Sequence, residues 1–565
     1  MENYLIKNYN FIAILFQFLK KTFILLSICF RLIATCTIIF YFFIMKLDRS
    51  ALLSVIADHS QMWDVLVIGG GATGLGIALD AATRGYKTLL VEQSDFAKGT
   101  SSRSTKLVHG GVRYLAQGDV SLVREASIER GLLQKNAPHL VKNQTFIIPI
   151  YSWWDRVKYT IGLKFYDWIA GRLSLGPSVF ISRKKTIDAL PDIQTKGLVG
   201  GVLYHDGQFD DSRLAINLVQ SIVEKGGYAV NYVKVTSLLK DNKEQLNGAT
   251  IKDMESGHIY TIQARSVVNA TGVFVDGILK MDNPNAPKSV VASQGVHLVL
   301  NKKFYRSKHA LMIPETSDGR VLFAVPWHNE VVVGTTDTPI GEPSLEPQAL
   351  EKEIQFILNT ASAYLVEKPK RQDVLSVFAG LRPLAAPKDG KAKTKEISRS
   401  HKIIVSPSNL FTIIGGKWTT FRKMGEDMMN YIEKHLGWNH VKPVTGDMQV
   451  HGYSENVNFN DPLYFYGSDA QKIKELMNGD AGKWLSESLK IHEKQVVWAV
   501  ENEMARNIED VLARRTRALL LDARESIRIC PEVAKIIAKV LNKNDEWVEN
   551  EIATFTKLAN NYILS

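Results

Sequence analysis

The stretch MWDVLVIGGGATGLGIALDAATRGYKTLLVEQSD, residues 62–95, decides the fold of this chain. Residues 65–68 form a continuous apolar run, which is typical of a strand buried on both faces. A glycine-rich turn follows, then a helical pattern over residues 75–84, and then a second apolar run over residues 88–91. Strand, turn, helix and strand in this order predict a Rossmann-like unit of a parallel α/β sheet.

The turn of this unit carries the pattern Gly69-x-Gly71-x-x-Gly74. The first glycine permits the tight turn, the second lets the backbone approach a pyrophosphate, and the third lets helix and strand pack closely. The phosphates would then lie at the positive N-terminus of the helix. Glu92 ends the second strand, 18 positions after Gly74, where a carboxylate can accept hydrogen bonds from ribose hydroxyls. Together these residues predict a dinucleotide site.

Distant segments indicate which dinucleotide binds. The sequence contains no second motif of this kind, so a separate NAD site is not expected. A strand pattern ends in Asn269-Ala270-Thr271-Gly272, and residues 409–428 read as a strand, a Gly-Gly turn and a helix starting near Thr419. The amides of that helix and Lys417 could hold an anion or a flavin carbonyl oxygen. A long flavin dinucleotide contacted by several segments explains this arrangement better than NAD.

Composition limits the class of protein. The 565 residues suffice for two to four domains, and 45% hydrophobic with 22% charged residues is typical of a globular chain. The net charge is +11, of which residues 1–50 contribute +4. The remaining basic charge is too dilute to indicate a nucleic-acid partner, and it suits an anionic small substrate or an anionic membrane surface. Three cysteines provide neither a disulfide framework nor metal-ligand spacing, so we expect a reducing compartment and no metal.

The N-terminal segment, residues 1–50, is hydrophobic and allows two interpretations. Residues 22–44 carry a single charge, Arg31, and have the length of a membrane span. No small-residue cleavage pattern follows, which argues against a removed signal peptide. Either this segment anchors the protein, or translation begins at Met45, which opens an ordinary soluble start.

Further along the chain the patterns predict an interleaved FAD-binding and substrate-binding region over residues 51–445, and an all-helical domain over residues 446–565. Residues 120–136 have helical periodicity, and residues 321–339 read as a hairpin of two β-branched runs around a Pro-Trp-His-Asn turn. Residues 387–396 form a basic, solvated loop. The expected fold is therefore α/β: a Rossmann-like FAD-binding domain, a mixed-sheet substrate domain and a C-terminal all-helical domain.

The chain resembles the FAD-dependent (respiratory) glycerol-3-phosphate dehydrogenase family, within the D-amino-acid-oxidase-like class of flavoproteins. The matching stretches are IGGGATGLGIALDAATRGYKTLLVEQSDFAKGTSSRSTKLVHGGVRYL, VVNATG, VPWHNEVVVGTTDTP, AGLRPL and IGGKWTTFRKMGE. The segment EMARNIEDVLARRTRALLLDAR resembles the helical cap domain of that family. Only the first 50 residues fall outside the resemblance.

The resemblance implies a set of site residues. Those expected to bind FAD are Gly69, Gly71, Gly74, Glu92, Thr100, Ser101, Ser102, Lys106, His109, Gly110, Thr271, Gly272, Gly416, Lys417 and Thr419. Those expected to bind the substrate are Arg113, Tyr114, Arg382, Arg399 and Lys417. Some members of the family have Lys-Gly-Ser-His where this chain has Gln294-Gly295-Val296-His297, which weakens any role for position 294.

Chemistry supports the basic set independently of the resemblance. A phosphate dianion needs several fixed donors, and arginine offers planar, bidentate geometry. In flavin oxidation of a secondary alcohol, a hydride moves from carbon to the flavin N5 while a base removes the hydroxyl proton. His109 and His297 are the two candidate bases, and the sequence does not choose between them. Arg382 and Lys417 complete the expected catalytic set, because positive groups stabilise the reduced, anionic ring.

Residues 154–169 place Trp154, Val157, Ile161, Phe165, Trp168 and Ile169 at helical spacing, with basic residues on other faces. This pattern suits a helix that lies on an anionic membrane surface, but it fits an amphipathic helix packed on the core somewhat better.

The expected reaction is oxidation of sn-glycerol 3-phosphate to dihydroxyacetone phosphate, with electrons passed to a membrane quinone at the cytoplasmic face of the cell membrane. Three alternatives remain: an oxidase of the same fold that releases hydrogen peroxide, a flavin-bound module without turnover, and an NAD dehydrogenase. Expected partners are glycerol 3-phosphate, the quinone and an anionic membrane surface, without nucleic acid. A homodimer remains one option for the assembly.

Overall fold

A computed structural model describes residues 48–58, 60–111, 119–171, 175–314, 316, 320–386, 400–479 and 482–564. The chain divides into two compact units, residues 1–55 and residues 56–565. The helix α2 (Arg49–Ala57) begins in the first unit. The predicted hydrophobic stretch 22–44 and the predicted basic loop 387–396 lie outside the described residues. Among the described helices, none combines the length and the apolar character that a membrane crossing requires.

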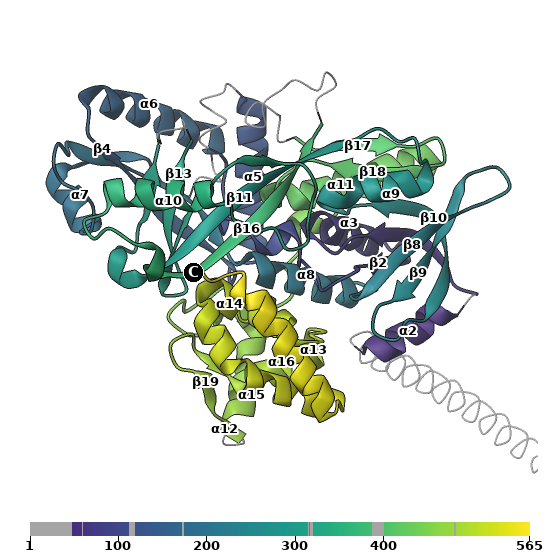
Figure 1. Ribbon diagram of the computed structural model, residues 1–565. Helices are drawn as coiled ribbons and strands as arrows, with labels where there is room; N and C mark the ends of the chain where they lie inside the picture. The colour runs from purple at the N-terminus through teal and green to yellow at the C-terminus, as the bar shows by residue number, and fades with distance from the viewer. Residues whose placement is uncertain are drawn as a thin grey trace, which may run out of the picture. The chain divides into compact units, whose positions relative to one another are not determined.

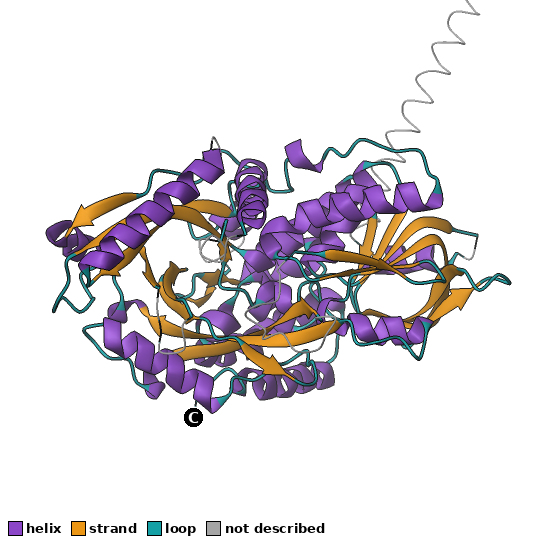
Figure 2. Ribbon diagram, turned by 90° about the horizontal axis from the view of Figure 1, so that it is seen from above, coloured by secondary structure: helices purple, strands orange, loops and turns teal. Residues whose placement is uncertain are grey.

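The first of two large sheets contains the glycine-turn unit predicted from the sequence (Figures 1 and 2). Its strands run in the order β17-β18-β10-β1-β2-β7, with β8 and β9 attached beside β10. They are β1 (Met62–Ile68), β2 (Thr88–Val91), β7 (Tyr228–Val230), β8 (Val233–Lys240), β9 (Leu246–Asp253), β10 (Ile259–Asn269), β17 (Lys402–Val405) and β18 (Leu410–Ile414). The five strands β18, β10, β1, β2 and β7 pair in parallel, as continuous apolar runs predict.

The helix that follows the glycine turn packs closely against a helix from the other end of the region 51–445. This pair is α3 (Ala72–Thr83) and α11 (Phe421–Leu436). A Cβ atom on Gly76 would come 2.5 Å from the carbonyl oxygen of Phe421. Gly425 is equally close to the backbone of Gly76, so the helices meet backbone to backbone. This approach places the N-terminal ends of both helices near the same part of the first sheet.

The second sheet is mixed. Its strands run in the order β15-β11-β14-β13-β12-β4-β6-β3, with β16 beside β11 and β5 beside β6. They are β3 (Leu107–Val108), β4 (Val141–Ile150), β5 (Val179–Ser182), β6 (Gly200–Phe209), β11 (Val290–Asn301), β12 (Ala310–Ile313), β13 (Leu322–Trp327), β14 (Glu330–Gly334), β15 (Thr338–Ile340) and β16 (Val374–Ala385).

The predicted hairpin at 321–339 is formed by β13 and β14, but its turn is shorter than expected. Pro326 and Trp327 belong to β13, and only His328 and Asn329 turn the chain, both with positive φ. Two left-handed residues form the mirror-image turn that matches the twist of paired strands.

Helices cover the two sheets (Figure 2). Besides α3 and α11 they are α5 (Val120–Asn136), α6 (Trp153–Ala170), α7 (Arg183–Ala189), α8 (Asp211–Glu224), α9 (Val275–Asp282) and α10 (Glu351–Tyr364). Helix α5 coincides with the helix predicted at 120–136, and α6 contains the amphipathic stretch 154–169.

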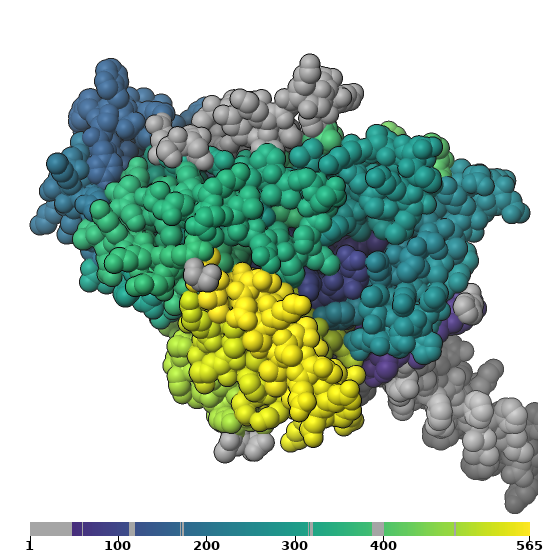
Figure 3. All heavy atoms as spheres, in the orientation of Figure 1, coloured from purple at the N-terminus to yellow at the C-terminus, as the bar shows by residue number. Residues whose placement is uncertain are grey.

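The C-terminal region, residues 464–564, is mainly helical. Its elements are α12 (Ala470–Gly479), β19 (Trp484–Ser486), β20 (Ile491–His492), α13 (Glu493–Asn502), the π-helix η10 (Asp510–Arg515), α14 (Ala518–Leu521), α15 (Ala523–Leu541) and α16 (Asp545–Asn560). The short ribbon of β19 and β20 corrects the expectation of an all-helical domain. The apolar core of the C-terminal region continues into the second sheet through Val299, Trp327, Val332 and Phe378. In the space-filling view the yellow atoms of the C-terminal region accordingly abut green atoms from the middle of the chain (Figure 3).

Candidate active site

A cavity of about 660 Å³ is lined by residues of both large sheets and of the segment that joins β2 to β3. The first sheet contributes Ile68 and Val91, and the second contributes His297, Phe323 and Arg382. Cavities of about 300–1,000 Å³ are the usual size of small-molecule and cofactor sites.

The glycine turn forms a cradle that side chains would fill. Gly69 has φ +110°, and a Cβ atom there would come 2.7 Å from the carbonyl oxygen of Ala270. A Cβ atom on Gly71 would lie 3.2 Å from Ser101 Oγ, and one on Gly74 would clash with the Gly69 carbonyl. Gly69 and Gly71 line the cavity at the first turn of α3, whose N-terminus favours an anion. This backbone fits the pyrophosphate of a dinucleotide.

Glu92 closes this end of the cradle. Its two carboxylate oxygens accept hydrogen bonds from the amides of Gly70, at 2.7 Å, and of Ser94, at 2.9 Å. Burial raises the pKa of Glu92. Each carboxylate oxygen has a further lone pair, so the side chain can fix the glycine turn and still accept a ribose hydroxyl.

Two of the three residues of the short helix η1 (Thr100–Ser102) line the cavity. Ser101 Oγ accepts a hydrogen bond from the amide of Ala72 at 2.9 Å, and the Ser101 carbonyl accepts one from Trp418 Nε1 at 2.8 Å. Thr100 Oγ1 donates to the Leu381 carbonyl. These bonds tie η1 to the glycine turn, to β16 and to the turn before α11.

The structure corrects the expected place of Lys106. Its ammonium lies 2.8 Å from both carboxylate oxygens of Asp211 and 2.7 Å from the carbonyl oxygen of Ser102. The rings of Trp327 and Phe378 cover it. Lys106 is fully buried and lies outside the described lining of the cavity, so it anchors the chain behind the site instead of extending along the cofactor.

Ser102, Gly110 and Gly74 also lie outside the described lining. A Cβ atom on Gly110 would lie 2.5 Å from Ser127 Oγ and would clash with the hydroxyl of Tyr166. Gly110 and Gly74 are therefore required for close packing next to the site.

The remaining predicted cofactor residues line the cavity from the first sheet's carboxyl edge and from the turn before α11. They are Thr271, Gly272, Gly416, Lys417 and Thr419, and His109 lies on the wall with them. Thr271 Oγ1 donates to Asn269 Oδ1 at 2.7 Å, and both glycines have positive φ.

His109 has a mixed electrostatic environment. Burial lowers its pKa, Asp206 acts against this, and the positive charges of Lys417 and Arg130 lower the pKa further. Asp206, which also lines the cavity, accepts hydrogen bonds from Arg130 at 2.8 Å and from the Tyr166 hydroxyl at 2.9 Å.

His297 projects from β11 into the same cavity and is 2% exposed. Its Nε2 lies 2.9 Å from Thr105 Oγ1, and its ring stacks on Phe378. Burial, together with Arg382 and Lys106, holds the pKa of His297 well below its ordinary value. The imidazole is therefore neutral near pH 7 and able to accept a proton.

Arg382 lies beside these groups on β16. Its Nη2 donates to Thr335 Oγ1 at 3.2 Å, and its Nη1 lies 3.6 Å from Asp337 Oδ1. Position 294, where some family members have lysine, is structural in this chain: Gln294 Nε2 donates to Glu353 Oε2 at 2.8 Å and to the Gln348 carbonyl at 2.9 Å.

Three of the predicted substrate residues, Arg113, Tyr114 and Arg399, lie outside the described residues. The two that are described, Arg382 and Lys417, both line the cavity. Sequence reasoning missed Thr105, Asp206 and Arg320, which also line it. Thr105 lies within the matching stretch over residues 68–115, but no role was expected for it. Asp206 and Arg320 belong to no motif, and only strand pairing and tertiary contacts bring them to the site.

Comparison with known proteins agrees with this geometry. The family model described as FAD dependent oxidoreductase matches residues 64–420, and the model described as C-terminal domain of alpha-glycerophosphate oxidase matches residues 413–548. A probable mitochondrial glycerol-3-phosphate dehydrogenase of Dictyostelium discoideum is 38% identical, over 88% of this chain and 84% of its own length. The mitochondrial glycerol-3-phosphate dehydrogenase of Saccharomyces cerevisiae is 36% identical, over 91% of this chain and 92% of its own length.

Among solved structures, the glycerol-3-phosphate dehydrogenase of Bacillus halodurans, complexed with FAD, is similar with a TM-score of 0.74 and 28% identity. The similarity covers 92% of this chain and 98% of that one. The sequence-based expectations of an α/β flavoprotein fold and of FAD are thereby confirmed. The glycine cradle and the two-sheet cavity agree with these matches, which extend over most of the chain. The chain therefore belongs to the family of FAD-dependent glycerol-3-phosphate dehydrogenases.

Proposed function

We propose that this protein oxidises sn-glycerol 3-phosphate to dihydroxyacetone phosphate and passes the electrons to a membrane quinone. One observation carries the proposal: Arg382, Lys417, His109 and His297 line the same cavity as the glycine cradle. That cavity combines a cofactor site, fixed positive charge for a phosphate and two imidazoles that can take a proton.

In the proposed reaction the substrate loses a hydride from carbon 2 and a proton from the hydroxyl on that carbon. When bound, FAD supplies the two-electron acceptor. Arg382 would bind the phosphate or the developing alkoxide, because its guanidinium offers paired donors. Lys417 would add positive charge on the cavity wall beside His109.

Either histidine could take the hydroxyl proton. His297 is held neutral by burial and by two cations, and Thr105 orients its Nε2. His109 is buried and lies near the opposing charges of Asp206 and Lys417. Their relative effects on the rate of flavin reduction are the measurement that assigns the base.

Quinone is the acceptor that we propose in preference to oxygen. The relatives at 36–38% identity are named dehydrogenases. The L-alpha-glycerophosphate oxidase of Mycoplasma pneumoniae, at 16% identity and a TM-score of 0.53, shares the fold alone. The test supplies glycerol 3-phosphate and compares reduction of a quinone analogue with release of hydrogen peroxide. Stoichiometric peroxide would establish the oxidase alternative.

The substrate is tested on the purified holoenzyme under anaerobic conditions. Addition of glycerol 3-phosphate should bleach the visible flavin absorbance, whereas glycerol without phosphate should bleach it far more slowly. A flavin spectrum that glycerol 3-phosphate leaves unchanged would refute the substrate.

We further propose that the protein attaches to an anionic membrane through α6. This helix exposes 81% of Trp154, 74% of Trp168 and 65% of Ile161, and its Arg156 lies over the rings of Trp153 and Phe180. Large apolar side chains beside basic ones are typical of helices that lie in a lipid interface. The relatives named above are mitochondrial enzymes, and we propose that the membrane to which this protein attaches contains quinone. The cytoplasmic face of the cell membrane and a homodimer remain predictions.

A further inference from the structure

The segment 95–103 lies between the cavity and the C-terminal region. On one side, the cavity is lined by Lys98, Gly99, Thr100, Ser101 and Arg103. On the other side, Asp95, Lys98 and Arg103 each contact a residue of the C-terminal region. A segment that lines a cofactor cavity is therefore held from outside at three points.

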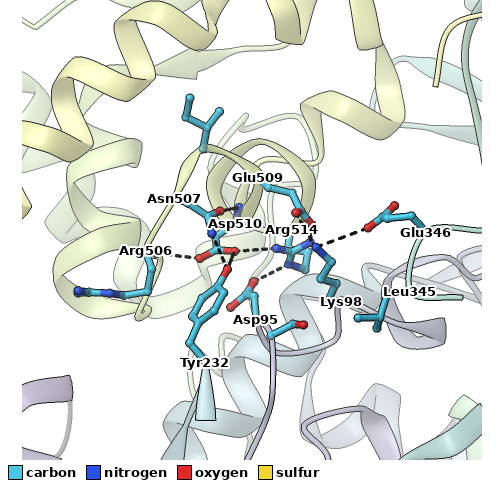
Figure 4. Close-up of polar contacts among 12 residues, drawn as sticks. Asp95, Lys98, Tyr232, Leu345, Glu346, Arg506, Asn507, Glu509, Asp510 and Arg514 are labelled. Carbon is cyan, nitrogen blue, oxygen red and sulfur yellow. Dashed lines mark hydrogen bonds and ion pairs between the residues drawn. The ribbon is translucent and has the colours of Figure 1, made fainter. Parts of the chain in front are cut away.

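The first contact joins Asp95 to two consecutive arginines of the π-helix η10, of which Figure 4 labels Arg514. Arg514 Nε and Arg515 Nη1 both bond to Asp95 Oδ2, and Arg515 Nη2 lies 3.0 Å from Oδ1. Arg514 also pairs with Glu509 and with Asp510, each at 2.7 Å. Asp95 is completely buried, so loss of an arginine partner would leave its charge buried and less compensated.

The second contact is made by Lys98, whose ammonium lies 2.7 Å from Glu509 Oε2 and 3.6 Å from Glu346 Oε1 (Figure 4). Glu509 therefore bridges Lys98, on the cavity wall, and Arg514, which holds Asp95. The Glu509 carboxylate is thus linked directly to Lys98 and, through Arg514, to Asp95.

The third contact holds the end of the segment. Arg103 Nη2 lies 3.0 Å from the hydroxyl of Tyr562 and 2.6 Å from Glu346 Oε2. Tyr562 is itself fixed, because its carbonyl accepts a hydrogen bond from the amide of Val377 on β16 at 2.8 Å. The last residues of the described chain therefore brace a side chain that lines the cavity.

These contacts are separate from the packing that attaches the C-terminal region. That region shares a continuous apolar core with the second sheet through Val299, Trp327, Val332 and Phe378. Burial of apolar surface is the main source of domain attachment, so loss of one polar anchor should leave the region docked. The three polar contacts, in contrast, hold the segment 95–103 that lines the cavity.

We propose that Glu509, Arg514, Arg515 and Tyr562 are positioning residues for the cofactor: they hold segment 95–103 against FAD, so that the C-terminal region sets how tightly FAD is bound. The proposal rests on the FAD cofactor of the family and not on the substrate or on the electron acceptor.

The test uses the full-length holoenzyme and the isosteric variants Glu509→Gln and Tyr562→Phe. Each removes one charge or one hydroxyl from the far side of the segment, and neither Glu509 nor Tyr562 belongs to the described lining of the cavity. The matched control is Glu255→Gln, which breaks the pair between Glu255 and Arg506, with N–O distances of 2.8 Å. That pair also ties the C-terminal region to the FAD-binding part of the chain, but it lies outside the described lining of the cavity.

The readouts are the rate of FAD release, followed by flavin fluorescence, and the visible spectrum of the bound flavin. Glu509→Gln should release FAD about tenfold faster and Tyr562→Phe about threefold faster, because each loses roughly one hydrogen bond to the segment. Glu255→Gln should release FAD at the wild-type rate. Should Glu509→Gln fail to fold, Tyr562→Phe decides alone.

Wild-type release from both variants, or release from Glu255→Gln as fast as from Glu509→Gln, would overturn the proposal. The second outcome would mean that any loosening of the C-terminal region releases FAD. Because FAD release is measured without substrate, a failure of the proposed oxidation leaves this test unaffected.

Discussion

Gly74 lies directly against the carbonyl oxygen of Gly69, so that a Cβ atom at position 74 has no room. Gly74→Ala should therefore displace the cradle, lose FAD and cost about 1–3 kcal/mol of stability through overpacking. Absorbance of the purified protein near 450 nm and thermal unfolding, followed by circular dichroism, measure both effects.

The matched control for Gly74→Ala is Gly162→Ala. Gly162 is also a helical glycine, and a Cβ atom there would meet no described atom within 4 Å. Because alanine favours helix over glycine, this variant should keep FAD and gain about 0.5–1 kcal/mol. Full FAD content in Gly74→Ala would show that the close contact is not required.

The two histidines are predicted to differ in the rate of flavin reduction. The variant that removes the base should retain FAD yet reduce it about 10²–10⁴-fold more slowly, which is the usual contribution of a general base. Stopped-flow bleaching of His109→Asn and His297→Asn under anaerobic conditions gives the two rates.

The pH dependence of the same rate adds a second criterion. If His297 is the base, its pKa well below the ordinary value places the acid limb of the reduction rate below pH 6.5. Wild-type reduction rates in both variants would exclude both residues.

His451 is predicted to make stability depend on pH. It lies 2.6 Å from Glu224 and 2.7 Å from Asp469. Burial alone would lower the pKa of His451, but these two carboxylates raise it from 6.5 to about 9. Because the folded state binds the proton more tightly, this stabilisation is full below pH 6.5 and is lost as the pH rises through about 9, and amounts to about 3 kcal/mol at most.

Urea unfolding of wild type and His451→Gln between pH 6 and 9.5 measures this contribution. The difference in unfolding free energy between them should shrink as the pH rises. His258→Gln, on an exposed turn, is the control and should follow the wild-type profile. A pH-independent difference for His451→Gln would contradict the prediction.

Membrane attachment is predicted to depend on the exposed face of α6. Trp154→Ser with Trp168→Ser should weaken binding to anionic vesicles about tenfold or more, because two large apolar side chains no longer enter the interface. Val366→Ser, which removes an apolar side chain 60% exposed elsewhere, is the control. Vesicle co-sedimentation measures the effect, and unchanged binding by the folded double variant would leave α6 as an ordinary surface helix.

Local patterns predicted the fold well where one element buries a regular face. The runs at 88–91 and 120–136 coincide with β2 and α5. A strand buried on both faces and an amphipathic helix each produce a pattern of apolar residues that can be recognised over a short stretch of sequence. The sequence patterns failed where distant contacts override local ones. The region predicted to be all-helical is interrupted within the segment EMARNIEDVLARRTRALLLDAR: Met504 and Arg517 adopt positive φ, and Arg514 and Arg515 pair with Asp95.

The same division holds for the site: residues in a local motif were predictable, and residues brought together only by folding were not. Glycine spacing identifies the cradle, because backbone geometry demands those residues at those positions. The place of Lys106 was not predictable, since its partner Asp211 is 105 positions away and only folding brings them together. Asp206 was missed for the same reason: nothing around it in the sequence distinguishes it from a strand residue that faces water.

His297 and Arg382 occupy neighbouring strands of one long antiparallel ladder, in which His297 pairs with Phe378 and Ser293 pairs with Arg382. A shift of either strand by a single residue would place His297 and Arg382 on opposite faces of the sheet. The pairing of the two strands therefore determines the distance between the His297 imidazole and the Arg382 guanidinium. Insertions in surface loops would therefore leave that spacing unaltered, and only changes within the two strands would alter it.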